Sequence, residues 1–190
     1  MKQIILASQS PRRKELLEMI GVRPEVIPPL YDEVMPKSGD PVLITTTFAR
    51  EKAQSVPDHG QAAIIIAADT IVSVDNVVYG KPKSRDEAVK MLEKMSGRIH
   101  QVVTGYALLD TERQELVTGH VITDVLMRSY GAKEIETHLN TTEYLDKAGA
   151  YAVQDRGAIL IERIEGDFYN IVGLPISSIY QELHKVGITI

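Results

Sequence analysis

The 190-residue sequence contains no cysteine, no hydrophobic run long enough to cross a bilayer, and no apolar signal region ahead of its first expected strand. Without cysteine, and with five histidines that show no ligand spacing, a zinc site is not expected. The lack of cysteine also fits a reducing compartment. Because neither a membrane span nor an export signal is expected, we predict a cytoplasmic protein.

Basic residues are also in the minority, because 21 Lys and Arg stand against 26 Asp and Glu and give a net charge of −5. This balance disfavours a nucleic acid polymer as partner, although it leaves room for a local basic pocket. The Walker-type phosphate loop, the glycine fingerprint of dinucleotide-binding proteins and any Ser-His-Asp arrangement are missing as well. No repeat or linker divides the chain, so we expect one domain over residues 1–190, with up to two closely joined lobes.

The hydrophobic pattern predicts an α/β fold with a mixed β-sheet and flanking helices, because helical segments alternate with strands and several strands form apparent hairpins. We expect strands at residues 4–7, 62–74, 77–79, 100–110, 116–127, 158–164 and 168–172. We expect helices at residues 11–20, 41–56, 85–95, 133–139 and 175–186. Asp75 and Asn76 should form a tight hairpin turn, and Ser84 with Glu87 should form a capping box.

Three cations, Arg12, Arg13 and Lys14, open the first helix directly after Ser10 and Pro11. The helix dipole disfavours cations at this end by roughly 0.3–1 kcal/mol each, so a negative ligand would explain them. A junction between a strand and a helix also presents unpaired backbone N–H groups, which bind phosphate in many folds. A minor-groove DNA contact is the less favoured alternative, since such arms are usually flexible tails of basic proteins.

Asp69 interrupts an otherwise apolar strand. An ionised carboxylate in such a place is costly unless it is paired, hydrogen-bonded or bound to metal. The tight turn would bring Asp69 within one residue of register of Lys81, so a structural ion pair with Lys81 and a functional role remain open alternatives. Ala67 and Ala68 leave room for a ligand beside the carboxylate, which favours the functional role.

Two further charged residues also have ordinary alternatives. Glu33 lies in an irregular loop, where it could be a solvated surface group, and Lys52 lies within a helix, where it could pair with a nearby glutamate in solvent. Glu33 and Asp69 could instead supply the carboxylates that Mg²⁺ needs when it bridges to phosphates. The side chains that could form a polyphosphate pocket are Arg12, Arg13, Lys52 and Lys81.

Seven short motifs follow one another over nearly the whole chain. They are SQSPRRKELL near the N-terminus, AREKA at 49–53, AADTIV at 67–72, GKP at 80–82, MSGR at 95–98, LDKAGAYAVQ at 145–154 and VGLPIS at 172–177. In these motifs and their order the sequence resembles the Maf family of nucleoside triphosphate pyrophosphatases. Seven ordered motifs make the resemblance far more specific than any single one.

The resemblance implies an elongated, two-lobed Maf/ITPase-like fold with a central cleft, often a homodimer. It implies hydrolysis of a nucleoside triphosphate to the monophosphate and pyrophosphate, with Asp69 as proton acceptor. Glu33 and Asp69 would hold a divalent metal, Mg²⁺ or alternatively Mn²⁺. By motif position, the implied site residues are Ser8, Arg12, Arg13, Glu33, Lys52, Asp69, Lys81 and Gln154.

The set Arg12, Thr70 and Gln154 resembles the branch of the family that acts on dTTP and UTP, rather than the relative that prefers 7-methyl-GTP. Two departures, Ala67 and Asp155 at positions where glycine is common, could reshape the pocket but remove no charged site residue. The alternative to an enzyme is a nucleotide-binding regulatory protein, for instance an inhibitor of septum formation in cell division. A regulator needs the phosphate pocket without the proton acceptor, and because the sequence has both we favour the enzyme.

Overall fold

A computed structural model describes residues 2–36, 38–57, 60–75 and 77–189 of the chain. At its centre is a mixed sheet with the strand order β2-β1-β3-β5-β6-β7, to which β4 adds by pairing with β3. The strands are β1 (Gln3–Leu6), β2 (Glu25–Val26), β3 (Ala63–Val74), β4 (Val77–Tyr79), β5 (Ile99–Asp110), β6 (Glu115–Met127) and β7 (Ile161–Glu165). β1 runs parallel to β2 and β3, and the other pairs are antiparallel, which confirms the predicted α/β fold with a mixed sheet.

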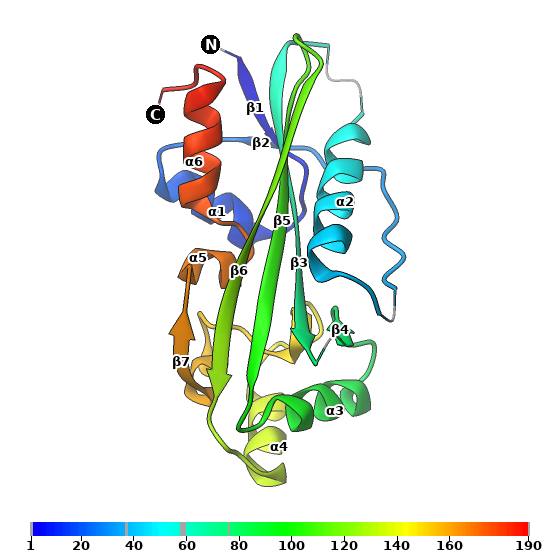
Figure 1. Ribbon diagram of the computed structural model, residues 1–190, viewed down its shortest axis with the longest axis vertical. Coiled ribbons are helices and arrows are strands. Elements are labelled where there is room, and N and C mark those ends of the chain that lie inside the picture. The colour runs from blue at the N-terminus through cyan, green and yellow to red at the C-terminus, as the bar shows by residue number, and fades with distance from the viewer. Residues whose placement is uncertain (1, 37, 58–59, 76, 190) are drawn as a thin grey trace.

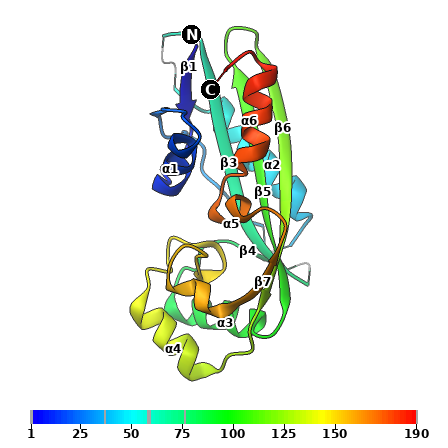
Figure 2. The ribbon, with the colours of Figure 1, turned by 90° about the vertical axis from the view of Figure 1, so that its left-hand side faces the viewer.

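The helices flank this sheet on both faces. They are α1 (Pro11–Met19), α2 (Pro41–Gln54), α3 (Arg85–Met95), α4 (Ala132–Thr141), α5 (Phe168–Val172), α6 (Ile176–Lys185) and the 3₁₀ helices η1 (Ala148–Ala150) and η2 (Arg156–Leu160). In Figures 1 and 2, α2 covers one face of the long strands and α1, α5 and α6 lie on the opposite face. α3, α4 and the 3₁₀ helices gather at the far end of the sheet.

The molecule is elongated, because β3, β5 and β6 run through both groups of helices (Figure 1). The described part of the chain has no helix that is both long and apolar enough to cross a membrane. The division of residues 1–190 into a single domain with two lobes stays a prediction.

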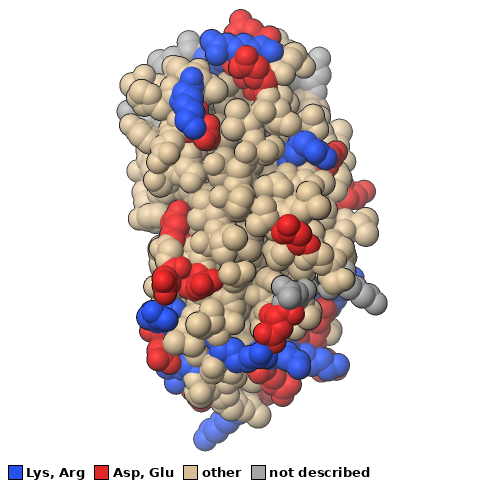
Figure 3. All heavy atoms as spheres, in the orientation of Figure 1, with Lys and Arg blue, Asp and Glu red and all other residues tan. Residues whose placement is uncertain are grey.

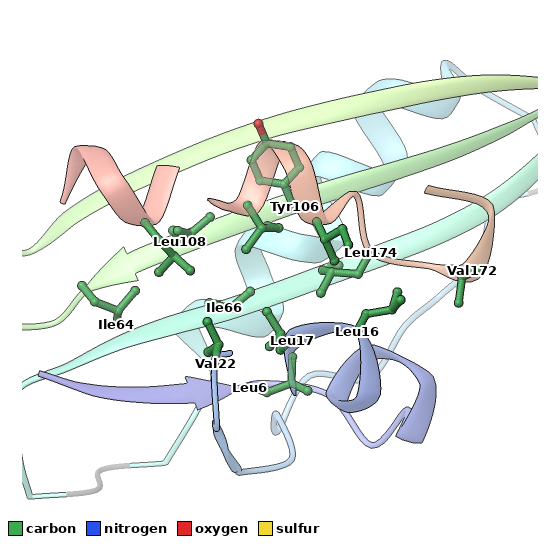
Figure 4. Packing of buried hydrophobic residues seen from close by; sticks show 14 of the residues in the cluster. Leu6, Leu16, Leu17, Val22, Ile64, Ile66, Tyr106, Leu108, Val172 and Leu174 are labelled. Carbon is green, nitrogen blue, oxygen red and sulfur yellow. The ribbon is translucent and has the colours of Figure 1, made fainter. Parts of the chain in front are cut away.

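Side chains of β3 alternate between the two faces of the sheet and divide the core into two layers. Ile64 and Ile66 pack in the layer formed with α1 and α6 (Figure 4). Ile65 and Ala67 pack in the layer formed with α2. All residues of β3 are buried except Thr70, which is half-buried, as expected for a strand covered on both faces.

α2 approaches the sheet most closely at Gly105 of β5. A Cβ atom there would lie 2.3 Å from the carbonyl carbon of Thr45 and 2.4 Å from the backbone nitrogen of Thr46. The missing side chain therefore allows the α2 backbone to rest directly on the sheet. Gly105 pairs in register with Asp69 of β3, so the close approach lies beside the residue that interrupts the apolar strand.

Local signals determine where the helices begin. Pro11 occupies the first turn of α1 as predicted, and the Asp40 carboxylate caps α2 by accepting a hydrogen bond from a first-turn N–H. The Ser84 hydroxyl accepts from the Glu87 N–H at 3.2 Å and caps α3. The Glu87 carboxylate accepts from the Lys83 N–H at 2.7 Å instead of from Ser84, so only half of the predicted capping box forms.

The predicted tight hairpin between β3 and β4 is confirmed. Val74 pairs with Val77, as a two-residue connection requires. Asp75 has a positive φ of 49°, which is the conformation that the favoured hairpin turns need. Asn76, the other predicted turn residue, lies outside the described residues.

The C-terminal segment differs from the prediction in two places. Residues 168–172, predicted as a strand, form α5, because the Asp167 carboxylate caps its first-turn N–H groups. The strand predicted at 158–164 begins only at Ile161, since the preceding residues form η2 under a cap from Asp155. In both places a carboxylate cap favours helical geometry over a short apolar strand pattern.

His100 on β5 is buried at the far end of the sheet. Its Nε2 atom lies 2.7 Å from the hydroxyl oxygen of Tyr151. Burial lowers the pKa of His100 from 6.5 to about 4. The folded protein therefore keeps this imidazole neutral at pH values where the unfolded chain binds a proton.

We expect His100 alone to lower the free energy of unfolding by about 2 kcal/mol between pH 7.5 and pH 5, because only the unfolded chain takes up the proton in this range. His100→Gln should lose this part of the pH dependence, whatever its stability at the higher pH. Urea unfolding at both pH values measures the effect, and His120→Gln controls for the loss of an exposed histidine. An equal pH dependence in wild type and His100→Gln contradicts the prediction.

Candidate active site

β3 has an open stretch along one edge. β1 pairs with β3 only as far as Leu6 opposite Ile66, and β4 pairs with it only from Val72 onward. On this edge no further strand pairs with residues 67–71 in the described structure, whereas β5 pairs with them on the other side. Because the open stretch follows the carboxyl end of β1, beside the start of α1, it lies where α/β folds commonly bind ligands.

Asp69 meets a lysine and a second carboxylate at this open edge. Lys52 Nζ of α2 lies 2.6 Å from Asp69 Oδ1 and 2.5 Å from Glu33 Oε1. It also lies 3.5 Å from the carbonyl oxygen of Ala68. Asp69 and Lys52 are only 5% and 6% exposed, and Glu33 reaches them from an irregular loop. We refer to Glu33, Lys52 and Asp69 as the carboxylate–lysine cluster.

Two alternatives that the sequence left open, a solvent-facing Lys52 and an ion pair between Asp69 and Lys81, are wrong. Lys52 does pair with a glutamate, Glu33, but the lysine is buried and does not face solvent. The partner of Asp69 is Lys52 rather than Lys81, because the β3–β4 ladder ends at Val72 opposite Tyr79 and does not extend to Lys81. Asp69 is therefore paired with a lysine from α2, and not with the lysine that the hairpin register predicted near it.

Arg13 holds a second group of polar residues together. Its Nε donates to the carbonyl oxygen of Gly173 at 2.8 Å, Nη1 donates to Ser8 Oγ at 3.1 Å, and Nη2 donates to Thr70 Oγ1 at 3.2 Å. Burial lowers the pKa of Arg13 below its ordinary value. The charges of the carboxylate–lysine cluster's two acids act in the opposite direction. We refer to Ser8, Arg13, Thr70 and Gly173 as the Arg13 network.

The two groups lie on opposite faces of the same short stretch of β3. Asp69 and Thr70 are consecutive, so their side chains point to opposite faces of the sheet, one toward α2 and the other toward α1 and α5. Both groups border the open edge, where the backbone of residues 67–71 has no strand partner in the described structure. A ligand at this edge can therefore reach cations from both faces.

The other two cations of α1 have different partners. Lys14 pairs with Glu18 at 3.6 Å on the exposed surface of the helix. Arg12 Nη1 lies 3.1 Å from Asp146 Oδ2, which links α1 to the segment before η1. Of the three, Arg12 and Arg13 are therefore oriented toward neighbouring segments of the fold, and Lys14 is not.

The structure also brings Asp146 and Lys147 to Arg12, although the sequence did not identify either of them as a candidate residue. Lys147 Nζ lies 2.7 Å from Asp146 Oδ1, and its side chain is 9% exposed. Burial raises the pKa of Asp146, but hydrogen bonds from Lys147 and Arg12, with their charges, outweigh it and hold that pKa below its ordinary value. The signal that could have identified both residues is the motif 145–154, where small residues surround single polar side chains.

Lys81 and Gln154, two predicted site residues, stand apart from these groups. Both are exposed, and neither side chain has a hydrogen bond or ion pair with another described residue. Their segments are joined through backbone, because the Gly149 N–H donates to the Gly80 carbonyl oxygen at 3.1 Å. Of the nine predicted site residues, the structure thus gathers six in the two groups, pairs Arg12 with Asp146, and leaves Lys81 and Gln154 exposed.

The carboxylate–lysine cluster suits one divalent cation with few protein ligands. Among the described residues no group of three or more His, Cys, Asp or Glu could hold a metal. Asp69 Oδ2 is buried and has no hydrogen-bond partner in the described structure, and Glu33 brings a second carboxylate to the same place. Mg²⁺ binds through one or two carboxylates, completed by water and phosphate oxygens, so these residues fit it.

Two hollows on the surface lie away from these groups. One is formed by β4 and α3 and lined by Tyr79, Glu87 and Met91. The other is lined by Ala53, Ile65 and neighbouring residues at the end of α2. Neither contains a predicted site residue, so the central cleft stays a prediction.

Fold and site together define an α/β protein in which Arg13 of the first strand-to-helix junction, a lysine of α2 and two carboxylates border an open strand edge. Residues 3–186 match the family model described as Maf-like protein. The chain therefore belongs to the family of Maf-like proteins.

Curated relatives are similar to this chain over nearly their full length. The dTTP/UTP pyrophosphatase of Alkaliphilus metalliredigens is 45% identical, with 97% of this chain and 96% of the relative covered. The dTTP/UTP pyrophosphatase of Clostridioides difficile is 44% identical, with 96% and 94% covered. That of Bacillus cereus strain G9842 is 40% identical, with 100% and 98% covered.

The buried pair of Lys52 and Asp69 generates a prediction about stability. Lys52→Met should lower the free energy of unfolding by about 3–5 kcal/mol, because it leaves the Asp69 charge buried without its cation. Lys52→Met combined with Asp69→Asn should recover most of this loss. Urea unfolding at neutral pH measures all three proteins. A double variant as unstable as Lys52→Met would mean that the ion pair does not account for the loss.

Proposed function

We propose that this protein is a nucleoside triphosphate pyrophosphatase that hydrolyses dTTP and UTP to the monophosphate and pyrophosphate. The observation that carries the proposal is buried Asp69, paired with Lys52 and with one oxygen free of described partners, while Arg13 lies on the other face of the same open stretch of β3. The substrates come from the relatives named dTTP/UTP pyrophosphatase, which resemble the chain over almost its entire length.

The phosphate groups bind at the start of α1. The Ser10 side chain makes no capping hydrogen bond, so first-turn backbone N–H groups are available to an anion. Arg13 uses three of its five N–H donors within the protein, and the other two have no described partner. Arg12 and exposed Lys81 add positive charge from neighbouring segments.

Asp69 accepts the proton from the attacking water. The water oxygen forms a bond to the α-phosphorus, the bond from that phosphorus to the bridging oxygen breaks, and pyrophosphate leaves. Lys52 holds Asp69 Oδ1, so Oδ2 is the carboxylate oxygen that has no described partner. Arg13 stabilises the negative charge on the phosphate oxygens.

Glu33 and Asp69 bind the divalent cation that we propose, Mg²⁺ by preference and Mn²⁺ as the alternative. When bound, it would neutralise phosphate charge and polarise the phosphoryl oxygens. Calorimetric titration with Mn²⁺ tests this assignment without any turnover. Binding that is unchanged in Glu33→Gln and Asp69→Asn would place the cation elsewhere.

We further propose that the enzyme acts in the cytoplasm, where nucleoside triphosphates are used, and can form a homodimer as the resemblance implies. A nucleic acid polymer is not among its proposed partners. The net charge of −5 disfavours such binding, and on the face in Figure 3 Lys and Arg are interspersed with Asp and Glu.

Asp69→Asn should lower kcat for UTP and dTTP by at least about a hundredfold, because an amide cannot accept the proton. Nucleotide should still raise its melting temperature, since the phosphate-binding cations remain. Pyrophosphate release with UTP, dTTP, CTP and GTP in Mg²⁺ measures the effect. Asp124→Asn, which changes a carboxylate on β6 outside the site, is the matched control. Wild-type turnover in Asp69→Asn contradicts the proton-acceptor role.

The same assay separates the enzyme from the regulatory alternative. A regulator binds nucleotide but releases no pyrophosphate, even in the wild-type protein. Nucleotide-induced stabilisation without pyrophosphate release would therefore overturn the proposed activity and support the regulatory function.

Gln154 should read the base, because its amide can match the N3–H donor and the adjacent carbonyl acceptor of uracil and thymine. Its side chain has no hydrogen bond to another described residue, which leaves both amide groups available to a ligand. A glutamate lacks the donor, so Gln154→Glu should lower kcat/KM for UTP and dTTP by roughly 5- to 150-fold relative to GTP. Steady-state kinetics with the four nucleotides measure this ratio.

The control for this change is Gln181→Glu, which makes the same substitution at an exposed position on α6. It should leave the ratio among bases at the wild-type value. A uniform loss across all bases in Gln154→Glu would remove Gln154 from the base-reading role and assign it to the structure of its loop.

A further inference from the structure

Two threonine hydroxyls lie one behind the other next to the Arg13 guanidinium. Thr70 of β3 and Thr104 of β5 are directly opposite in the antiparallel ladder, and their Oγ1 atoms are 2.9 Å apart. Thr104 is 0% exposed and contacts Arg13 only through Thr70 in the hydrogen bonds described. Behind Thr104, its Oγ1 lies 3.0 Å from the carbonyl oxygen of Asn170 in α5.

The direction of these hydrogen bonds follows from the donor inventory. A carbonyl oxygen only accepts, so the single hydroxyl hydrogen of Thr104 is donated to Asn170. The Thr70 hydroxyl has two acceptors, Thr104 Oγ1 at 2.9 Å and the Gly173 carbonyl oxygen at 3.4 Å, and it donates to the nearer one, Thr104. Thr70 in turn accepts from Arg13 Nη2 at 3.2 Å. The result is one directed chain from Arg13 through Thr70 and Thr104 to the α5 backbone, and such chains strengthen each member.

α5 provides a fixed end for this chain. The Asn170 side chain is fully buried and donates through Nδ2 to the Val102 carbonyl oxygen and to Thr123 Oγ1, both at 2.9 Å. The carbonyl oxygen of Gly173, at the end of α5, receives Arg13 Nε at 2.8 Å. α5 therefore holds the guanidinium directly at Nε and, through the two threonines, at Nη2.

We propose that Thr104 is a positioning residue for the polyphosphate site, acting through Thr70 to fix the orientation of Arg13. The proposal rests on the function proposed above and extends it to a residue that never touches the ligand. A guanidinium held in place loses less freedom when it binds phosphate, so its two remaining donors bind more tightly. Because the Thr70 hydroxyl takes part in this chain, Thr70 influences substrate binding through Arg13 and the phosphate groups. It does not act by contacting the base.

Thr104→Val tests the proposal, because it removes the hydroxyl and keeps the branched shape. We expect affinity for inorganic tripolyphosphate to fall roughly five- to tenfold, and KM for UTP and GTP to rise by the same factor with kcat near wild type. Thr104→Ser should restore most of the affinity. The control is Thr45→Val, another fully buried threonine, whose hydroxyl donates to backbone carbonyls of α2.

A double-mutant cycle with Arg13→Lys checks the route of the effect. If Thr104 acts through Arg13, Thr104→Val should add almost nothing to the loss already present in Arg13→Lys. Thr70→Val, at a half-buried position, should weaken tripolyphosphate binding in the same way and supplies the same test should Thr104→Val fail to fold. Independent, additive losses from Arg13 and the threonines overturn the proposal.

Several outcomes decide against Thr104 specifically. Unchanged tripolyphosphate affinity in the threonine variants overturns the proposal, as does an equal loss in Thr45→Val or a loss that depends on the base.

Calorimetric binding of tripolyphosphate needs no turnover, so a wild type that binds it without hydrolysing any nucleotide overturns the proposed function alone. Wild-type protein that binds no tripolyphosphate overturns the phosphate site and this inference together.

Discussion

The carboxylate of Asp69 is buried inside a strand covered on both faces, and the arrangement around it follows from the need to compensate that charge. Lys52 is the compensating cation, and it reaches Asp69 only because α2 lies close against the sheet. Gly105, paired in register with Asp69, permits that approach, since a side chain there would collide with the α2 backbone. Gly105 on β5 thus helps to bring Lys52 of α2 to Asp69 of β3.

The open stretch of β3 lies directly at this buried pair. β1 is too short to cover residues 67–71, and the hairpin to β4 pairs only the strand's last residues. Because consecutive side chains on a strand alternate, Asp69 and Thr70 present different chemistry on the two faces. The carboxylates and Lys52 gather on the α2 side, and Arg13 is held on the α1 side.

The site also connects the two ends of the molecule. Arg12 of α1 meets Asp146, and Asp146 meets buried Lys147, in the segment that leads to η1. The Asp146 carboxylate therefore neutralises one cation from each group of helices. This explains why the pKa of Asp146 is lowered although burial alone would raise it. Charge at the start of α1 is in this way linked to the segment that carries Gln154.

The sequence by itself determined the features that depend on neighbours in the chain. Pro11 placed the start of α1, the burial pattern placed β3, and the order of seven motifs indicated the family, because these signals are local. Only the tertiary structure decided that Asp69 pairs with Lys52 instead of Lys81, since that choice depends on how α2 packs against the sheet. The hydroxyl chain from Thr70 to Thr104 likewise joins residues from different strands, and strand pairing over that separation is set by the fold and not by local pattern.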